Sequence, residues 1–287
     1  MINTVNDIKT VAIIGAGTMG LGIAQICAMS GFKTILFDIE KDSLSKAEKA
    51  IIGNLDKGIE KGKVSEEDKA KALDLISYTS DIKSVIADFI IEAIVENLDV
   101  KRKVFLQLEA LNADHTILAS NTSSIPITKI ASVLTKPERM VGMHFFNPAH
   151  IMKLVEVISG AATDNNTTEL TVKLAEKLNK TPVRAQDSPG FIVNRVARHF
   201  YVESLKVLEE GVTEVEGLDR LMETSGFRMG PFKLMDLIGV DTNYSVTESM
   251  FRAFHEDPKF RPNRIQEQKV NAGHHGRKSG RGFYNYE

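Results

Sequence analysis

The segment TVAIIGAGTMG at residues 10–20 determines how the N-terminal part of the chain folds. Its first five residues are an apolar run of strand length, and apolar residues at helical spacing follow the segment. Three glycines, Gly15, Gly17 and Gly20, stand between the two with the spacing GxGxxG. Because the motif follows a strand and opens a helix, it predicts a loop that binds the pyrophosphate of a dinucleotide.

Each position of this loop has a physical reason. Gly15 allows a tight turn, Gly17 lets the backbone approach a pyrophosphate, and Gly20 lets the helix pack closely on the strand. The backbone N–H groups at the start of the helix, around Thr18 and Met19, carry the positive end of the helix dipole. Both features favour an anionic phosphate group at this place.

Asp38 ends a second apolar strand, predicted at residues 34–38, and lies 18 residues after Gly20. An acid at this position binds the 2′-hydroxyl of the adenosine ribose. Its charge repels the additional phosphate of NADP, so the sequence predicts NAD as the cofactor. The alternative interpretation is that Asp38 only caps a helix at the end of the strand.

After Asp38 the chain alternates between helical and strand-like segments. A lysine-rich amphipathic helix is expected at residues 41–61, and the closer spacing of the last two strands indicates a hairpin or meander. Strands that alternate with helices form a largely parallel sheet. Strand-like runs are predicted at residues 76–79, 89–93, 116–119, 140–145 and 154–158.

Beyond residue 186 the strand signal disappears, and helical patterns begin with a long helix at residues 191–210. We therefore predict an α/β domain of the Rossmann type, with a mostly parallel sheet, over residues 1–186. This domain is expected to bind the dinucleotide. Residues 187–287 are predicted to form an all-α domain.

The composition argues against several classes of protein. The net charge of the 287 residues is −2, which gives no electrostatic attraction to nucleic acid or to an anionic membrane. The single cysteine, Cys27, can form neither an internal disulfide nor a Cys-rich zinc site, and no metal is expected. The sequence shows no signal peptide and no apolar run of bilayer length, so the expected location is the cytoplasm.

Further motifs extend over nearly the whole chain, and together they resemble one family. The sequence is similar to the 3-hydroxyacyl-CoA dehydrogenases, most of all to bacterial 3-hydroxybutyryl-CoA dehydrogenases. It departs from the family pattern at Ala149-His150 and at residues 271–275. The resemblance is carried by GAGTMG at 15–20, NTSS at 121–124, HFFNP at 144–148, KLVEV at 153–157, DSPGFIVNR at 187–195, MGPFKLMDLIGVDT at 229–242 and GRKSGRGFYNY at 276–286.

The resemblance implies a role for each matching residue. His144 matches the catalytic histidine and Glu156 its partner acid, while Ser123 and Asn194 match the residues that orient the substrate oxygen. It also implies a homodimer formed through the helical domain, which takes part in substrate binding. The remaining matches are the cofactor contacts Glu96, Lys101, Asn147 and Lys278 and the coenzyme A contacts Asn54 and Lys61.

These residue types suit the implied chemistry. Oxidation of a secondary alcohol requires a group that removes the hydroxyl proton as hydride leaves carbon. Histidine does this near neutral pH because its unperturbed pKa is about 6.5. A carboxylate beside it orients the ring and stabilises the imidazolium. The expected reaction is the NAD-dependent interconversion of an (S)-3-hydroxyacyl-CoA, such as 3-hydroxybutyryl-CoA, and a 3-ketoacyl-CoA, such as acetoacetyl-CoA.

Two alternatives remain open from the residues. One is a dehydrogenase of free 3-hydroxyacids, which shares the nucleotide-binding fold but uses a catalytic lysine. The other is a protein that binds a dinucleotide, or serves a structural role, without catalysis. On this second interpretation His144 is a structural histidine, and Glu156 belongs to the polar face of a strand.

Overall fold

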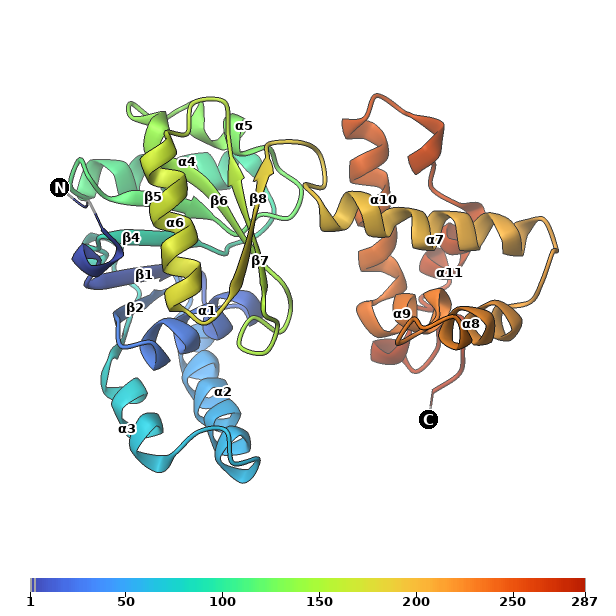
Figure 1. The fold of residues 1–287 in the computed structure, drawn as a ribbon, viewed down its shortest axis with the longest axis horizontal. Helices are drawn as coiled ribbons and strands as arrows, with labels where there is room; N and C mark the ends of the chain where they lie inside the picture. Colours follow the sequence, from blue (N-terminus) through green and yellow to red (C-terminus); the bar gives the residue numbers. More distant parts are fainter. Residues whose placement is uncertain (1, 3, 287) are drawn as a thin grey trace. The chain divides into compact units, whose positions relative to one another are not determined.

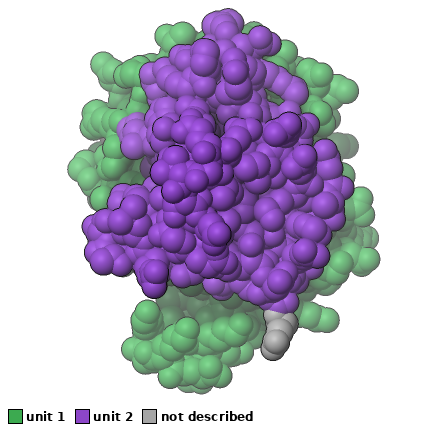
Figure 2. Space-filling model, turned by 90° about the vertical axis from the view of Figure 1, so that its right-hand side faces the viewer, with its two compact units in different colours: residues 1–188 green, residues 189–287 purple. Residues whose placement is uncertain are grey.

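A computed structural model describes residue 2 and residues 4–286 of the chain. The chain divides into two compact units, residues 1–188 and 189–287 (Figure 2). The boundary lies two residues beyond the predicted one. Asp187 belongs to the first unit because its carboxylate accepts hydrogen bonds from the backbone N–H groups of Ile127 (2.9 Å) and Thr128 (2.8 Å).

The first unit is built on one eight-stranded sheet with the strand order β3-β2-β1-β4-β5-β6-β7-β8 (Figure 1). All neighbouring strands run parallel except β6 and β7, which pair antiparallel as the predicted hairpin. The strands are β1 (Thr10–Ile14), β2 (Lys33–Phe37), β3 (Ile76–Thr79), β4 (Phe89–Glu92), β5 (Ile117–Ser120), β6 (Met140–Phe145), β7 (Leu154–Ser159) and β8 (Thr181–Gln186). The predicted α/β fold of the Rossmann type is therefore confirmed.

Helices cover both faces of this sheet. One large apolar core joins one face to α1, α2, α3 and α6, while α4 and α5 cover the other face (Figure 1). The predicted lysine-rich helix is α2, whose buried residues recur with the period of a helix. The helices are α1 (Thr18–Met29), α2 (Lys41–Glu60), α3 (Glu66–Asp74), α4 (Leu98–Leu111), α5 (Ile127–Ala131) and α6 (Asn165–Lys177).

Strand β8 was not predicted from the sequence. It pairs parallel with β7 at the edge of the sheet, and most of its side chains are at least partly exposed. Pro182 and Arg184 interrupt the apolar pattern that identifies a buried strand. Both residue types are tolerated at an edge, where one side of the backbone needs no partner strand.

The second unit is entirely helical in its described part apart from isolated β-bridges near its end. Two buried acids organise it. Asp219 accepts from the amides of Phe232 and Lys233 at the start of α9, and Asp236 accepts from the amides of Phe283 and Tyr284. The C-terminal motif is thereby attached to α9. The helices of this unit are α7 (Val193–Glu209), α8 (Val215–Thr224), α9 (Pro231–Ile238), α10 (Val240–Ala253) and α11 (Arg264–Asn271).

Within the described residues, no helix combines the length and the apolar character that crossing a membrane requires.

Candidate active site

The glycine motif forms a tight loop between β1 and α1. Gly15 has φ +103°, and a β-carbon there would lie 2.7 Å from the carbonyl oxygen of Ala93. A β-carbon on Gly20 would lie 1.7 Å from the carbonyl oxygen of Gly15, so the close packing of helix on strand requires glycine. Gly17, by contrast, is exposed, and a β-carbon there would contact nothing within 4 Å. Space for a ligand therefore lies in front of this loop.

Gly17 is also the N-cap of α1, and no described side chain caps this helix end. The N–H groups of its first turn, which includes Thr18 and Met19, are hydrogen-bond donors that the helix itself does not use. With the helix dipole, they suit an anion such as a pyrophosphate. The loop therefore fits the phosphate part of a dinucleotide.

Asp38 lies directly after β2 and is connected to the glycine loop. Its Oδ2 accepts the N–H of Ala16 at 2.7 Å, and its Oδ1 accepts the N–H of Glu40 at 3.0 Å. Glu40, not Asp38, is the N-cap residue of α2, so the helix-cap interpretation is wrong. Because a carboxylate offers about four lone pairs, Asp38 retains capacity to accept a ribose hydroxyl.

His144 and Glu156 form the central pair of the site. They occupy directly opposed positions of the antiparallel strands β6 and β7. His144 Nδ1 lies 2.7 Å from Glu156 Oε2, and the two residues are only 6% and 1% exposed. The predicted hairpin is what places them face to face. In a buried pair of this kind, the carboxylate orients the ring, and the other ring nitrogen can accept or donate a proton.

Ser123 lies in the loop that follows β5, the parallel neighbour of β6. This loop is tied to the end of β6, because Asn121 Oδ1 accepts the N–H of Phe145 at 2.8 Å. The amide of Ser123 donates to Glu96 Oε1 at 3.2 Å. Ser123 thus lies beyond the carboxyl end of its strand, where open α/β sheets bind ligands.

Glu96 and Lys101 belong to a polar network at the same edge of the sheet. Lys101, which is 1% exposed, lies 3.2 Å from Glu96 and 2.6 Å from Glu92. Burial acts to raise the pKa of Glu96. The charge of Lys101 and the hydroxyl donors Thr122 and Ser124 outweigh burial and hold this pKa below its usual value.

Glu92 also belongs to this network and was not predicted from the sequence. It is fully buried at the end of β4 and accepts from Lys101 Nζ (2.6 Å), Ser120 Oγ (2.6 Å) and the amide of Ile94 (2.7 Å). Burial raises its pKa against the opposing effect of Lys101. An acid that ends an otherwise apolar strand was the available signal, because a buried charge needs partners.

Asn147 is exposed in the turn that joins β6 to β7. The turn is anchored by Lys180, which is 8% exposed and donates from Nζ to the carbonyl oxygens of Ala149 (2.5 Å) and Met152 (2.8 Å). Burial, together with the charge of Lys153, lowers the pKa of Lys180 to about 8. This ammonium group therefore holds the turn that carries Asn147 and connects His144 to Glu156.

The two predicted coenzyme A contacts lie on α2 and at its end. Asn54 is partly buried and donates to Gln25 Oε1 of α1 at 3.2 Å. Lys61 is the exposed C-cap residue of α2, two helical turns further on. The structure gives these residues no contact with His144 or with the glycine loop, and their role remains a prediction.

Asn194 and Lys278 lie in the second unit. Asn194 is in the first turn of α7, and Lys278 Nζ donates to Asp241 Oδ2 at 2.7 Å. Within the second unit, Lys278 therefore has a structural partner. The contacts of both residues with substrate or cofactor stay predictions.

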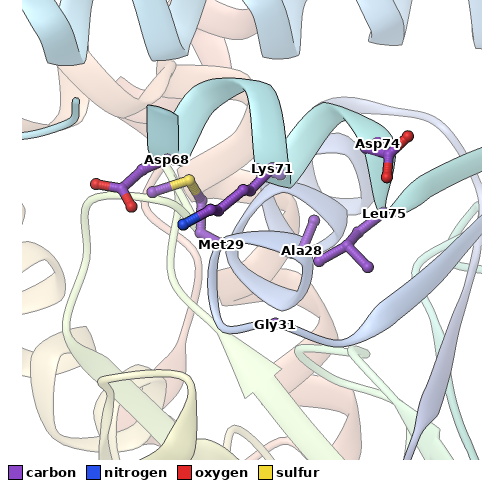
Figure 3. A pocket seen from close by; sticks show the side chains of 8 residues that line it. Ala28, Met29, Gly31, Asp68, Lys71, Asp74 and Leu75 are labelled. Carbon is purple, nitrogen blue, oxygen red and sulfur yellow. The ribbon is translucent and has the colours of Figure 1, made fainter. Parts of the chain in front are cut away.

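A separate hollow lies at the other end of α1, against α3 (Figure 3). Asp68, Lys71 and Asp74 line it together with Met29 and Leu75. Since α1 has 12 residues, this place is about 18 Å from the glycine loop along the helix. The hollow contains none of the predicted site residues and is not part of the candidate active site.

Comparison with known proteins relates both units to one family. The family model described as the NAD binding domain of 3-hydroxyacyl-CoA dehydrogenase matches residues 10–188. The model of the C-terminal domain of 3-hydroxyacyl-CoA dehydrogenase matches residues 190–286. The two models together cover nearly the whole chain.

Individual relatives agree with this match. A 3-hydroxyadipyl-CoA dehydrogenase of Escherichia coli is 44% identical over 98% of the chain, which spans 59% of that protein's length. A probable 3-hydroxybutyryl-CoA dehydrogenase of Bacillus subtilis is 42% identical, with 98% of each chain covered. The crystal structure of (S)-3-hydroxybutyryl-CoA dehydrogenase from Ralstonia eutropha has a TM-score of 0.94 at 41% identity and covers 98% of this chain and 99% of its own.

Proposed function

Because the chain belongs to the 3-hydroxyacyl-CoA dehydrogenase family, we propose that it oxidises (S)-3-hydroxyacyl-CoA to 3-ketoacyl-CoA with NAD and catalyses the reverse reduction. The observation that carries the proposal is the buried pair of His144 and Glu156 in the unit with the dinucleotide loop. The two relatives are named for substrates with a six-carbon dicarboxylic acyl group and a neutral four-carbon acyl group. We therefore propose short acyl chains, with 3-hydroxybutyryl-CoA and acetoacetyl-CoA as the simplest pair.

His144 acts as general base in the oxidation and as general acid in the reduction. Its Nδ1 faces Glu156, so Nε2 is the nitrogen that exchanges the proton with the substrate oxygen. Glu156 holds the ring in this orientation and stabilises the imidazolium as it forms. NAD, when bound, supplies the carbon that accepts the hydride.

The cofactor is proposed to be held by the loop at residues 15–20 and by Asp38, whose charge favours NAD over NADP. Glu96, Lys101, Asn147 and Lys278 are proposed to contact its nicotinamide half, as the family resemblance implies. Ser123 and Asn194 are proposed to donate hydrogen bonds to the substrate oxygen, which polarises the carbonyl during the reduction. Asn54 and Lys61 are proposed to contact coenzyme A.

We also propose a homodimer formed through the second unit. Helices α8 and α9 pack together and carry apolar side chains that are largely exposed in one chain, Leu221 (60%), Leu237 (49%) and Ile238 (44%). A two-fold contact between copies would bury them. Light scattering at micromolar concentration should give the mass of a dimer, and a monomer would argue against this assembly.

The function is tested by incubating the protein with NAD and (S)-3-hydroxybutyryl-CoA while NADH formation is followed. The (R) isomer, NADP and free 3-hydroxybutyrate serve as controls. Turnover that requires the (S) thioester and NAD supports the proposal. Turnover of the free acid would favour a 3-hydroxyacid dehydrogenase. NAD binding without turnover of any of these substrates would favour a non-catalytic protein.

A further inference from the structure

A buried arginine in the second unit has no acidic partner. Arg198 of α7 is 2% exposed. Its Nη1 donates to the carbonyl oxygen of Asn243 (3.0 Å), to Asn243 Oδ1 (3.1 Å) and to Thr247 Oγ1 (3.0 Å). All three acceptors are neutral. Among the described residues, no carboxylate forms an ion pair with this guanidinium group.

The hydrogen bonds of Arg198 are concentrated on one nitrogen. Nη1 has three acceptors, whereas Nε is buried and has no hydrogen-bond partner in the described part of the chain. A guanidinium group binds a carboxylate through two parallel N–H donors on one edge. Nε and Nη2 form one such edge, and its Nε has no acceptor among the described residues.

The surroundings do not neutralise the charge. Asn243 is itself fixed by Gln266, whose Nε2 donates to its Oδ1 at 2.9 Å, and the ring of Tyr201 lies 5.2 Å from the guanidinium carbon. Burial lowers the pKa of Arg198 to about 10, so the group is still charged at neutral pH. A buried charge without a counter-ion costs stability, and apolar residues of similar volume would serve a purely structural purpose better.

The position of Arg198 relates it to the substrate. It lies four residues after Asn194, so the two side chains are on the same face of α7 with about 5–6 Å between their β-carbons. Asn194 is proposed above to orient the oxygen on the third carbon of the acyl chain. A carboxyl group that ends a six-carbon acyl chain is three bonds from that carbon.

From this arrangement we propose that Arg198 binds the terminal carboxylate of the substrate, and that the preferred substrates are thioesters of 3-hydroxy or 3-keto dicarboxylic acids. The proposal rests on the function proposed above and specifies its substrate class. The carboxylate supplies the counter-ion that the described residues do not provide. A neutral acyl chain of the same length leaves Arg198 buried and unpaired.

The test compares two six-carbon substrates that differ only at the far end, 3-ketoadipyl-CoA and 3-ketohexanoyl-CoA, each reduced with NADH. A charge-assisted hydrogen bond contributes about 1.5–3 kcal/mol, so kcat/KM for the diacid is expected to be about ten- to a hundredfold higher. Arg198→Met should bring the ratio of the two kcat/KM values close to one. Because the ratio is measured within one protein, a general loss of activity cancels.

Lys206→Met is the matched control, since it removes an exposed positive charge from the same helix and should leave the ratio unchanged. If Arg198→Met does not fold, Arg198→Lys replaces it, because lysine cannot form the bidentate pair and should lower the ratio several-fold. A wild-type protein that uses both substrates equally, or an Arg198 variant that keeps the full preference, overturns the proposal. Failure of the proposed function would be distinct, since acetoacetyl-CoA would then not be reduced either.

Discussion

His144 and Glu156 are paired directly across β6 and β7, with 2.7 Å between Nδ1 and Oε2. The contact therefore depends on the register of the hairpin. A shift of one strand by one residue would turn its side chains to the opposite face of the sheet and separate the pair. Lys180 holds the turn of this hairpin through the carbonyl oxygens of Ala149 and Met152, which supports the register on which the pair depends.

The first prediction concerns His144. Replacement by alanine removes the general acid and base, and turnover of acetoacetyl-CoA with NADH should fall by about 10²–10⁴-fold. NADH binding, measured by fluorescence titration, should stay close to that of the wild type. Unchanged turnover, or a variant that does not fold, would contradict the assignment.

Glu156 is tested by Glu156→Gln, which keeps the size of the side chain but removes its charge. The imidazolium that forms during oxidation then loses its partner, and kcat should fall at least about tenfold while KM for the substrate changes little. Glu169→Gln is the matched control, because Glu169 is exposed and pairs with the exposed Arg184, away from the candidate site. If the two variants lost activity equally, a specific role of Glu156 would be excluded.

Asp38 is predicted to set the cofactor preference. The double variant Asp38→Ser with Ile39→Arg removes the negative charge and places a positive one at a side chain that is 75% exposed. The kcat/KM ratio of NADPH to NADH should rise about ten- to a hundredfold. Ile39→Arg alone is the control and should change the ratio less, since the carboxylate remains. A wild-type protein that already prefers NADPH would refute the role of Asp38.

The buried pair of Lys101 and Glu92 is predicted to control the stability of the first unit. Lys101→Met leaves the carboxylate of Glu92 buried without its counter-ion, which should lower the free energy of unfolding by about 3–5 kcal/mol. Urea unfolding followed by a probe in the first unit measures this loss. The double variant Glu92→Gln with Lys101→Met should lose less than the single variant.

This loss should depend on pH, with a defined sign. The pKa of Glu92 is raised by burial, and removal of Lys101 raises it further. The folded variant therefore holds a proton that the unfolded chain releases once pH exceeds the ordinary carboxyl range. The stabilisation from that proton is fully present below the pKa that Glu92 has in the unfolded chain. It is lost as pH rises through the pKa that Glu92 has in the folded variant. The difference from the wild type should thus be larger at pH 8 than at pH 5, and a difference independent of pH would contradict this explanation.

Much of the fold follows from local sequence signals. The strands at residues 76–79 and 140–145 coincide with the predicted ones, because each is an apolar run with clear ends. Strand β8 could not be recognised, since an edge strand is stabilised by its pairing with β7 and not by an apolar pattern of its own. The hairpin of β6 and β7 was indicated only by the short distance between the two runs.

The candidate site likewise contains residues that the sequence predicts and residues that it does not. The glycine loop and Asp38 have fixed sequence spacings, because one strand–loop–helix unit and the adjacent strand position them. Arg198 follows no motif, and the one sequence signal for Glu92 is its place at the end of an apolar strand. Partners of both residues come from segments distant in the sequence, Ser120 for Glu92 and Asn243 for Arg198, so only the folded chain shows what they contact.

The central claim is that this chain reduces a 3-ketoacyl thioester with NADH. It is tested most directly by NADH oxidation in the presence of acetoacetyl-CoA, run beside NADPH and beside free acetoacetate. Rapid turnover only with NADH and the thioester is the predicted result, and it would establish the reaction, the cofactor and the need for coenzyme A together. Demonstrated NADH binding without turnover of the thioester would contradict the claim.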